Sequence, residues 1–550
     1  MGTGASTLPM PEGAKPLSKE TLEALSGLPE AAKKELLQNL EQMTPRAQEA
    51  PKPNAAIPTE PLASAAAVIE AIHTKKTSCV AAVEAALARI EQTADILAVV
   101  DVLKEEALQR AKAVDEKIAA GTALERLEGL PIVVKINIDG PSGSLTTAST
   151  PALKDWHPTL NAPIVEKLLA AGAIVIGKTN LPELAIGLQS LSFVHGRTLN
   201  PINFEYNAGA SSSGTAAAIA AGIVSCGLGT DTAGSLRMPS ACCGTVGMRP
   251  SSKRPDATSA RWPGEGVVGI SSMRDVPGPM GSCVGDVALL DAVVAGDEVV
   301  ATKADAGSLK LGVPMDWINQ AETIPARKGV GLSPAVQAAL ALVKEKLTKA
   351  GAAVKDVSGM ADVLKTSEDT WPVNTPQLSL PVPFEDPHSA LQAYLDRHES
   401  RPESIKTADQ VIEQISEGYK KSHQPHFTGP RAVPEEDRKK KLEATEVGIV
   451  KLEEAYRSFF AKNEIQVLML PTFPSGPTKI EEGPGMGMKV LFNEVLFLFH
   501  MNEIHVPSIV LPIPGCKYED SNVPCSLLLY GLDDKQLLSV ALAVEDAIKA

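Results

Sequence analysis

The sequence predicts an α/β fold in which helices cover both faces of a central sheet. Amphipathic helical stretches alternate along the chain with short runs of apolar, β-branched residues. A run that is apolar throughout is typical of a strand buried on both faces, and such strands need helices on both sides of the sheet. The 550 residues include 44% hydrophobic and 21% charged side chains, as in a globular protein with a large core. The aromatic share of 4% favours an aliphatic, helix-rich interior.

The first 60 residues are expected to form an extension outside this domain. Leucines recur with helical spacing in residues 18–43, and a linker rich in Pro and Ala follows in residues 44–61. We interpret residues 1–60 as a helical extension that solubilises or docks the protein. The sheet domain is expected to span residues 61–550.

Within this domain the elements follow from the periodicity. We expect helices at 64–90, 105–119, 161–171, 215–221 and 334–350, and strands at 130–134, 173–176, 352–354, 467–471 and 508–512. Gly177 is expected to close the second of these strands. Residues 360–445 are polar, contain Pro and have helical spacing only in patches. We interpret 360–445 as a variable region that shapes a substrate pocket.

Charge and hydropathy exclude several kinds of partner. The net charge of −14 repels polyanions, and the basic run at 438–441 follows acidic residues as on a solvated helix face, so no nucleic acid is expected. The apolar stretch 490–510 is interrupted by Glu494 and Glu503, so we expect no integral membrane span. The N-terminus has no secretory signal pattern. These observations predict a cytoplasmic protein and leave the oligomeric state open, a homodimer included.

Two short patterns bear on the compartment. The seven cysteines include no pair with CxxC spacing, which argues against a zinc site or a disulfide framework and favours a reducing compartment. The first six residues match the N-myristoylation pattern M-G-x-x-x-[ST]. A single acyl chain anchors only weakly, so this pattern leaves membrane association as an alternative.

Two segments rich in small residues indicate a catalytic site. They are 208–215 (AGASSSGT) and 229–237 (GTDTAGSLR). Small residues allow tight turns in which several backbone N–H groups point at one spot, as an oxyanion requires. A serine that closes such a loop can act as a nucleophile when a base takes its proton.

Lys135 is the better candidate for that base. It ends the apolar strand at 130–134, where a lysine is unusual. Burial favours the neutral amine, although a shift of its pKa from about 10.4 to neutrality costs about 4 kcal/mol. His195 lies sixteen positions before Ser211 with no orienting carboxylate nearby in the sequence, and we interpret it as a structural or pocket residue.

These segments, taken together and in order, resemble the amidase signature family. The resemblance extends from about residue 62 to Ala550 and includes further blocks at 177–185 (GKTNLPELA), 200–201 (NP) and 243–250 (CGTVGMRP). It implies a large mixed, twisted sheet covered by helices on both faces. It also implies an amidase that hydrolyses carboxamide C–N bonds without metal or organic cofactor.

The resemblance implies specific roles. Ser235 would be the nucleophile, Lys135 the base and Ser211, preceded by a cis peptide bond, the proton relay between them. The backbone N–H groups of the nucleophile loop would form the oxyanion hole; these are the N–H groups of Thr232, Ala233, Gly234 and Ser235. Three neighbouring residues would brace the loops, namely Asp231, Arg237 and Ser212.

The sequence departs from the family pattern at three places. Gly209-Ala210 stands where Gly-Gly is common, and the nucleophile loop has Ala233 where Gly is usual. Ile136 follows the lysine where Asp is frequent. None of these changes removes a reacting atom, so they put pocket details in doubt and leave the catalytic residues unaffected.

The substrate remains open between several amides. The segments 262–269 and 273–280 resemble the indoleacetamide and mandelamide hydrolase branch, which favours a small aryl or alkyl carboxamide as substrate. The Ser-Ser-Ser and Thr-Ala-Gly-Ser variants are similar to allophanate-type hydrolases instead. The sequence is also compatible with the amidase subunit of a tRNA-dependent amidotransferase and with a catalytically silent binding protein. The apolar segment 490–500 is either the lining of an acyl pocket or ordinary core.

Overall fold

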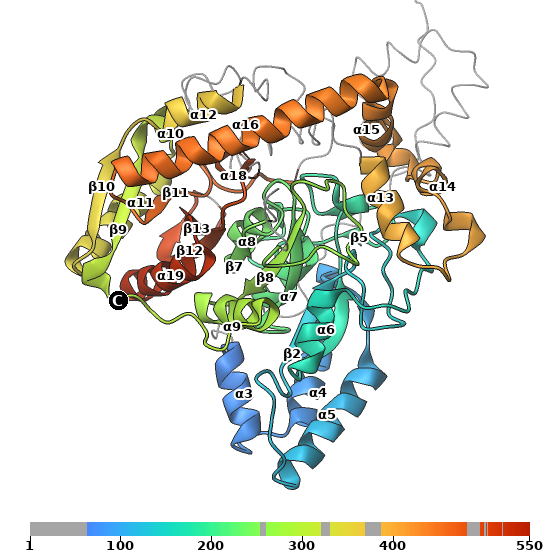
Figure 1. Ribbon diagram of the computed structural model, residues 1–550. Helices are drawn as coiled ribbons and strands as arrows, with labels where there is room; N and C mark the ends of the chain where they lie inside the picture. Colours follow the sequence, from blue (N-terminus) through green and yellow to red (C-terminus); the bar gives the residue numbers. More distant parts are fainter. Residues whose placement is uncertain are drawn as a thin grey trace, which may run out of the picture. The chain divides into compact units, whose positions relative to one another are not determined.

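The computed structural model describes residues 63–252, 260–320, 331–368, 387–480, 496–499, 502, 504–519 and 521–550 (Figure 1). The expected extension at 1–60 lies outside the described residues. Within them, no helix is long and apolar enough to cross a bilayer.

The described strands form one large sheet and one hairpin. The sheet has eleven strands in the order β1-β3-β2-β6-β8-β7-β12-β13-β11-β9-β10. Their bounds are β1 (Val99–Val102), β2 (Pro131–Lys135), β3 (Ile174–Thr179), β6 (Cys226–Asp231), β7 (Val246–Arg249), β8 (Val276–Gly281), β9 (Lys310–Pro314), β10 (Ala353–Val357), β11 (Val467–Pro471), β12 (Ser508–Lys517) and β13 (Pro524–Tyr530). The hairpin pairs β4 (Leu191–Ser192) with β5 (Gly196–Arg197).

The sheet is mixed, as predicted. β2 runs parallel to β3 and to β6, and β9 runs parallel to β10 and β11. The central strands β8, β7, β12 and β13 pair antiparallel with their neighbours. The parallel strands at 131–135 and 226–231 therefore end at the same edge, which is where Lys135 stands.

Helices flank this sheet. The described helices of four residues or more are α3 (Ala65–His73), α4 (Cys79–Gln92), α5 (Lys104–Ala119), α6 (Pro163–Ala170), α7 (Ser213–Ala220), α8 (Arg237–Cys243), α9 (Val284–Ala295), α10 (Met315–Gln320), α11 (Pro334–Lys349), α12 (Met360–Glu368), α13 (Pro387–Asp396), α14 (Ala408–Glu413), α15 (Glu417–Thr428), α16 (Glu435–Lys462), α18 (Leu496–Phe499) and α19 (Asp534–Lys549). Side-chain caps mark several starts: Ser64, Ser78, Ser333 and Asp533 each accept a first-turn N–H.

The two faces of the sheet bury separate apolar cores. In β2, Val133 packs with α4, α5 and α7, whereas Ile132 and Val134 pack with α6 and α9 on the other face. Successive strand residues point to opposite faces, so an all-apolar strand serves both cores. This arrangement confirms the predicted helix cover on both faces.

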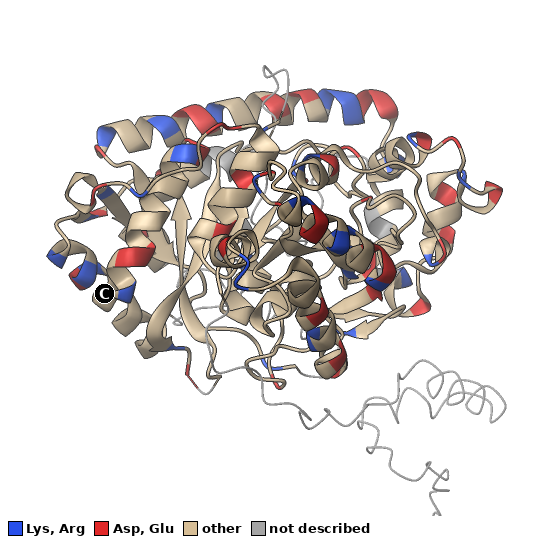
Figure 2. Cartoon of the chain, turned by 90° about the horizontal axis from the view of Figure 1, so that it is seen from below, with Lys and Arg blue, Asp and Glu red and all other residues tan. Residues whose placement is uncertain are grey.

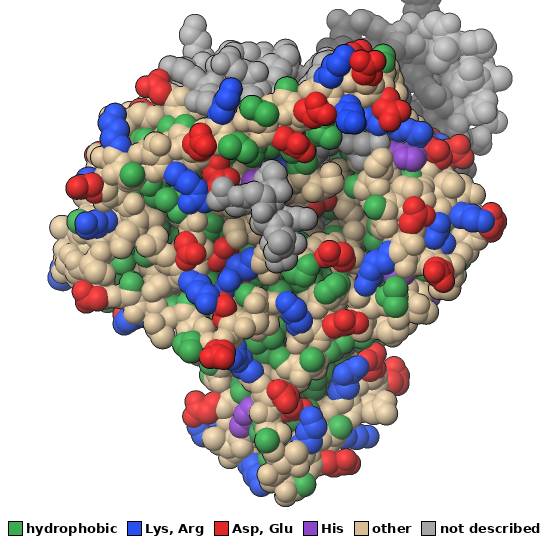
Figure 3. Space-filling view, viewed as in Figure 1, with side chains coloured by type: hydrophobic (Ala, Val, Ile, Leu, Met, Phe, Trp, Pro, Cys, Tyr) green, Lys and Arg blue, Asp and Glu red, His purple; other side chains and the backbone are tan. Residues whose placement is uncertain are grey.

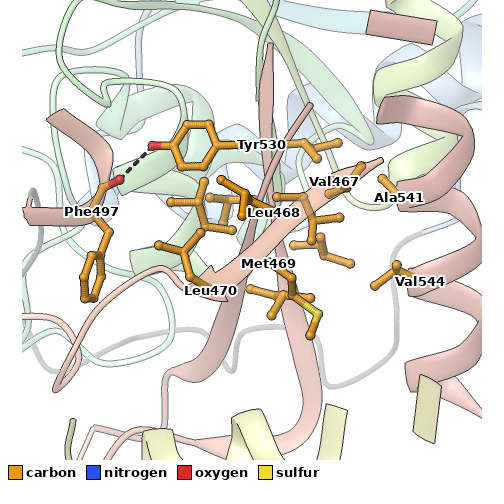
Figure 4. Close-up of a cluster of buried hydrophobic side chains, with 14 of the residues drawn as sticks. Val467, Leu468, Met469, Leu470, Phe497, Tyr530, Ala541 and Val544 are labelled. Carbon is orange, nitrogen blue, oxygen red and sulfur yellow. Dashed lines mark hydrogen bonds between the residues drawn. The ribbon is translucent and has the colours of Figure 1, made fainter. Parts of the chain in front are cut away.

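A third core surrounds the C-terminal strands. Val467 to Leu470 of β11 are fully buried, with Ala541 and Val544 of α19 beside them (Figure 4). Tyr530 Oη donates to the carbonyl of Phe497 at 2.7 Å. Phe497 therefore belongs to the core here, while the part of the 490–500 segment before residue 496 lies outside the described residues.

Several boundaries differ from the expectation. The strands expected at 508–512 and 352–354 extend to Lys517 and Val357. The helix expected at 64–90 is two helices, because the chain turns at Thr74–Ser78 with Lys75 in the left-handed region (φ 60°) before Ser78 caps α4. Gly177 lies inside β3 and does not close it. A Cβ there would meet Asp101 O of β1 at 2.8 Å, so glycine allows the two strands to approach.

The region expected to be irregular is largely helical where it is described. It contains α12 to α15 and part of the 28-residue α16, which runs across the sheet domain from α15 to α12 in Figure 1. Charged residues lie mainly on the outer helices, whereas the central strands contain few of them (Figure 2). Acidic and basic groups are interspersed over the face seen in Figure 3.

Candidate active site

Lys135 is the last residue of β2, and its side chain is 0% exposed. Its Nζ lies 2.7 Å from Ser211 Oγ and 2.8 Å from Thr230 Oγ1. Burial lowers the pKa of Lys135 to about 7, even though the charges of Asp231 and Asp275 favour the ammonium form. A large share of this amine is therefore neutral at neutral pH, as a base must be.

The loop before α7 brings Ser211 to this lysine. The Ala210–Ser211 peptide bond is cis, as the resemblance implies. The next residue, Ser212, ties the loop to β6, because its Oγ donates to Thr230 O at 3.1 Å and accepts from Thr230 N at 3.2 Å. Ser212 N also donates to Ser235 O at 3.2 Å, which joins the Ser211 loop to the loop of the expected nucleophile.

Ser235 lies in the turn between β6 and α8. It is partly exposed, whereas Asp231 to Gly234 before it and Leu236 after it are buried. Ser235 is thus the accessible residue of a turn that is otherwise packed into the protein. Gly234 has φ +113°, and a Cβ there would lie 3.0 Å from Leu498 Cδ1, so the tight turn before Ser235 requires glycine.

The buried carboxylate of Asp231 stabilises this turn. It accepts N–H bonds from Gly234 at 2.8 Å and Leu236 at 3.1 Å, and it pairs with Arg237 Nε at 3.0 Å. Burial alone would raise the pKa of Asp231, but the Arg237 and Arg249 guanidinium groups hold it well below its usual range. Asp231 and Arg237 therefore contact the loop that the resemblance implies they brace, and their importance for activity stays a prediction.

The expected oxyanion-hole donors do not all have the same surroundings. Gly234 N–H is directed to Asp231 and shapes the turn. Among the described residues, the N–H groups of Thr232, Ala233 and Ser235 have no hydrogen-bond partner. We therefore keep these three as candidate donors and assign Gly234 to the conformation of the loop.

Three residues that contact the site were not predicted from the sequence. Thr230 faces Lys135 because β6 runs parallel to β2, but the Gly-rich β6 has no apolar strand pattern. Arg249 donates to Asp231 O at 2.6 Å, and Asn502 Nδ2 donates to Asp231 Oδ1 at 2.7 Å. Arg249 lies in the family block 243–250, so a place in the site could have been predicted for it. No motif in the sequence around Asn502 indicates that this residue contacts the site.

His195 makes two hydrogen bonds within the protein, and its interpretation as a structural or pocket residue stays a prediction. Its Nε2 bonds Thr147 Oγ1 at 3.2 Å, and its backbone N–H donates to Ser192 Oγ at 3.0 Å. Burial lowers the pKa of His195. Among the described residues, no group of three His, Cys, Asp or Glu side chains could hold a metal ion. The expectation of a cofactor-free reaction stays a prediction.

Comparison with known proteins decides the family. A family-wide sequence profile described as Amidase matches residues 81–538. The chain belongs to the amidase family. Its enzymatic class, an amidase, follows from this match and from its amide-hydrolysing relatives, which confirms the family predicted from the motifs.

Several relatives of known activity are similar to this chain over different shares of its length. Mandelamide hydrolase of Pseudomonas putida is 31% identical over 85% of this chain and 87% of its own length. Indoleacetamide hydrolase of Rhizobium radiobacter is 28% identical over 88% and 97%. One subunit of the glutamyl-tRNA(Gln) amidotransferase of Chloroflexus aggregans is 35% identical, but over only 53% of this chain and 60% of that subunit. A solved amidase structure superimposes with a TM-score of 0.68 at 25% identity, covering 88% of this chain and 99% of that one.

Proposed function

We propose that this amidase hydrolyses a small carboxamide through an acyl-enzyme on Ser235, with Ser211 as proton relay and Lys135 as base. The observation that carries the proposal is the position of Lys135. Its amine is buried, lies 2.7 Å from Ser211 Oγ and has a pKa near 7. Burial of a lysine amine between two hydroxyls destabilises the folded protein. A role in proton transfer explains why the amine is buried there.

The reaction runs in two stages. Ser235 Oγ attacks the amide carbonyl while its proton passes to Ser211, whose own proton passes to neutral Lys135. The tetrahedral intermediate then expels the amine, which takes a proton back along the same relay. Water attacks the acyl-enzyme and gives a proton to the relay, and the relay returns a proton to Ser235 Oγ as its bond to the acyl group breaks and the acid leaves.

The developing oxyanion needs hydrogen-bond donors at fixed positions. Thr232, Ala233 and Ser235 have backbone N–H groups without partners among the described residues, in the loop that Asp231 braces. One such donor contributes about 3 kcal/mol to catalysis. We assign the oxyanion hole to these three groups and the catalytic domain to residues 61–550.

Mandelamide-like substrates have the strongest support. The relatives that cover most of this chain act on mandelamide and indoleacetamide by name, while the amidotransferase subunit covers about half of it. We therefore expect the purified chain to release ammonia from aryl and arylalkyl carboxamides without a partner protein. Ammonia release from glutamine only after addition of partner subunits would favour the amidotransferase alternative, and preference for allophanate would favour the urea-type alternative.

A covalent probe tests the nucleophile. A fluorophosphonate should label the wild type and Ser213→Ala equally, because Ser213 is buried and its Oγ has no hydrogen-bond partner among the described residues. Ser235→Ala should not be labelled. Labelling of Ser235→Ala at the wild-type rate would remove Ser235 from its role, and an unlabelled Ser213→Ala would point to a folding defect in the loop.

A further inference from the structure

A partly buried carboxylate outside the proposed catalytic residues ties the nucleophile loop to a neighbouring loop. Asp275 Oδ1 accepts the hydroxyl of Thr232 at 2.5 Å. Its Oδ2 accepts the backbone N–H groups of Ile270 at 2.7 Å and Ser271 at 3.0 Å. One carboxylate thus joins two loops that are about forty residues apart in the sequence.

The second of these loops is supported by another part of the fold. Val268 and Ile270 pack into an apolar core that includes side chains of α13, α14 and α15. We call these three helices the α13–α15 unit. Val268 O also accepts Asn137 Nδ2 at 3.1 Å, and Asn137 is two residues beyond Lys135. The loop at 268–271 therefore contacts the α13–α15 unit, the turn after the base and, through Asp275, Thr232.

The space around this loop is tight. A Cβ on Gly269 would lie 2.5 Å from Asp275 Oδ2, so the loop closes directly over the carboxylate. Thr232 itself is 7% exposed, and its hydroxyl is held by the bond to Asp275. Its backbone N–H is one of the three proposed oxyanion donors, and the orientation of that peptide depends on where the side chain is held.

We propose that Asp275 is a positioning residue: it fixes Thr232, and with it the oxyanion-hole N–H groups, relative to the loop that the α13–α15 unit supports. This proposal rests on the proposed function. An oxyanion donor acts on the transition state more than on bound substrate, so a misplaced Thr232 lowers kcat with little change in KM.

A double-mutant cycle tests the proposal. Thr232→Val removes the hydroxyl and keeps the shape, and Asp275→Ala removes both carboxylate oxygens and with them the bonds from Thr232, Ile270 and Ser271. We expect each to lower kcat by roughly 10- to 100-fold, as a misplacement of about 1 Å does, and the double variant to lose no more than the worse single variant. Thr232→Ser keeps the hydroxyl and should retain a kcat near that of the wild type.

The controls separate this proposal from a general loss of stability and from a failure of the proposed function. Thr472→Val changes another buried threonine, whose Oγ1 has no partner among the described residues, and should leave kcat unchanged. A wild-type kcat in Thr232→Val, or additive losses in the double variant, would overturn the positioning role. That result would leave the proposed function intact as long as Ser235→Ala remains unlabelled and inactive. Activity in Ser235→Ala would instead overturn the proposed function itself.

Discussion

Lys135 contacts two hydroxyls, and the proposal gives them different chemical roles. A neutral amine has one lone pair and two N–H groups. If the lone pair accepts the Ser211 proton, an N–H must point elsewhere, and Thr230 Oγ1 at 2.8 Å is its acceptor. Asn137 Nδ2 also approaches Thr230 Oγ1, at 3.4 Å. In the proposed mechanism, Thr230 therefore orients the lysine toward Ser211.

Thr230→Val tests this orientation. The variant keeps the shape of the side chain and removes the acceptor, so the amine loses its second anchor in a buried site. One such bond contributes about 1.5 kcal/mol, which corresponds to a loss of roughly tenfold in kcat/KM. Thr230→Ser should restore most of the rate. Steady-state kinetics of the three proteins decide the matter, and equal rates in all of them would exclude the orienting role.

At the scale of the elements, β6 lies against β2 because it is rich in glycine. The built Cβ of Gly227 would lie 2.6 Å from Val133 O, and that of Gly229 would lie 2.6 Å from Ser212 Oγ. Side chains at these positions would push β6 away from the base strand or from the Ser211 loop. The distance between Lys135 and the two loops thus depends on the absence of Cβ atoms.

Gly227→Ala should therefore destabilise the protein. The new methyl group meets backbone, which cannot rotate away, and overpacking of this kind costs about 1–3 kcal/mol. Gly285→Ala is the matched control, since a Cβ there meets only Cys283 Sγ at 3.7 Å and alanine favours the helix α9 by about 0.5–1 kcal/mol. Denaturant unfolding should give opposite signs for the two variants. A Gly227→Ala variant with the stability of the wild type would show that β6 and β2 can move apart without loss of stability.

The same glycines explain how far the structure could be predicted from the sequence. Aliphatic strands such as 467–471 and amphipathic helices such as 334–349 follow from periodicity, and the structure has both. β6 and β8 have no such pattern, since one is Gly-rich and the other contains Pro277 and Pro279. Both are central strands whose pairing depends on close backbone contact. Asn502 could not be predicted, since its contact with Asp231 spans 271 residues.

At the scale of the molecule, a buried carboxylate just after the base strand bonds the end of α13. Asp139, four residues after Lys135, accepts Tyr394 Oη at 2.8 Å and Arg397 Nη1 at 3.0 Å, and lies 3.0 Å from His398 Nε2. Tyr394 also accepts Trp156 Nε1 at 2.9 Å. The α13–α15 unit is thus attached to the segment that follows the proposed catalytic base in the sequence.

Asp139→Asn should loosen this attachment. It leaves Arg397, which is 24% exposed, without its carboxylate partner, and the cost of about 3–5 kcal/mol for breaking a fully buried pair is the upper bound for this one. We expect faster proteolysis within residues 387–428 than in the wild type, while Asp155→Asn, at an exposed position, should behave as the wild type does. Equal digestion of Asp139→Asn and wild type would show that apolar packing alone holds the unit.

The central claim is that neutral Lys135 accepts the proton of Ser235 through Ser211, and the pH dependence of acylation tests it most directly. The base works only when unprotonated, and its pKa is about 7, so the rate of labelling by a fluorophosphonate should rise with pH and level off above that value. Lys135→Met should lose most of the rate at neutral and alkaline pH alike, and Ser211→Ala should keep a small remnant. A wild-type rate that is constant from about pH 6 to 9, or a Lys135→Met variant with the same pH profile and rate, would contradict the account.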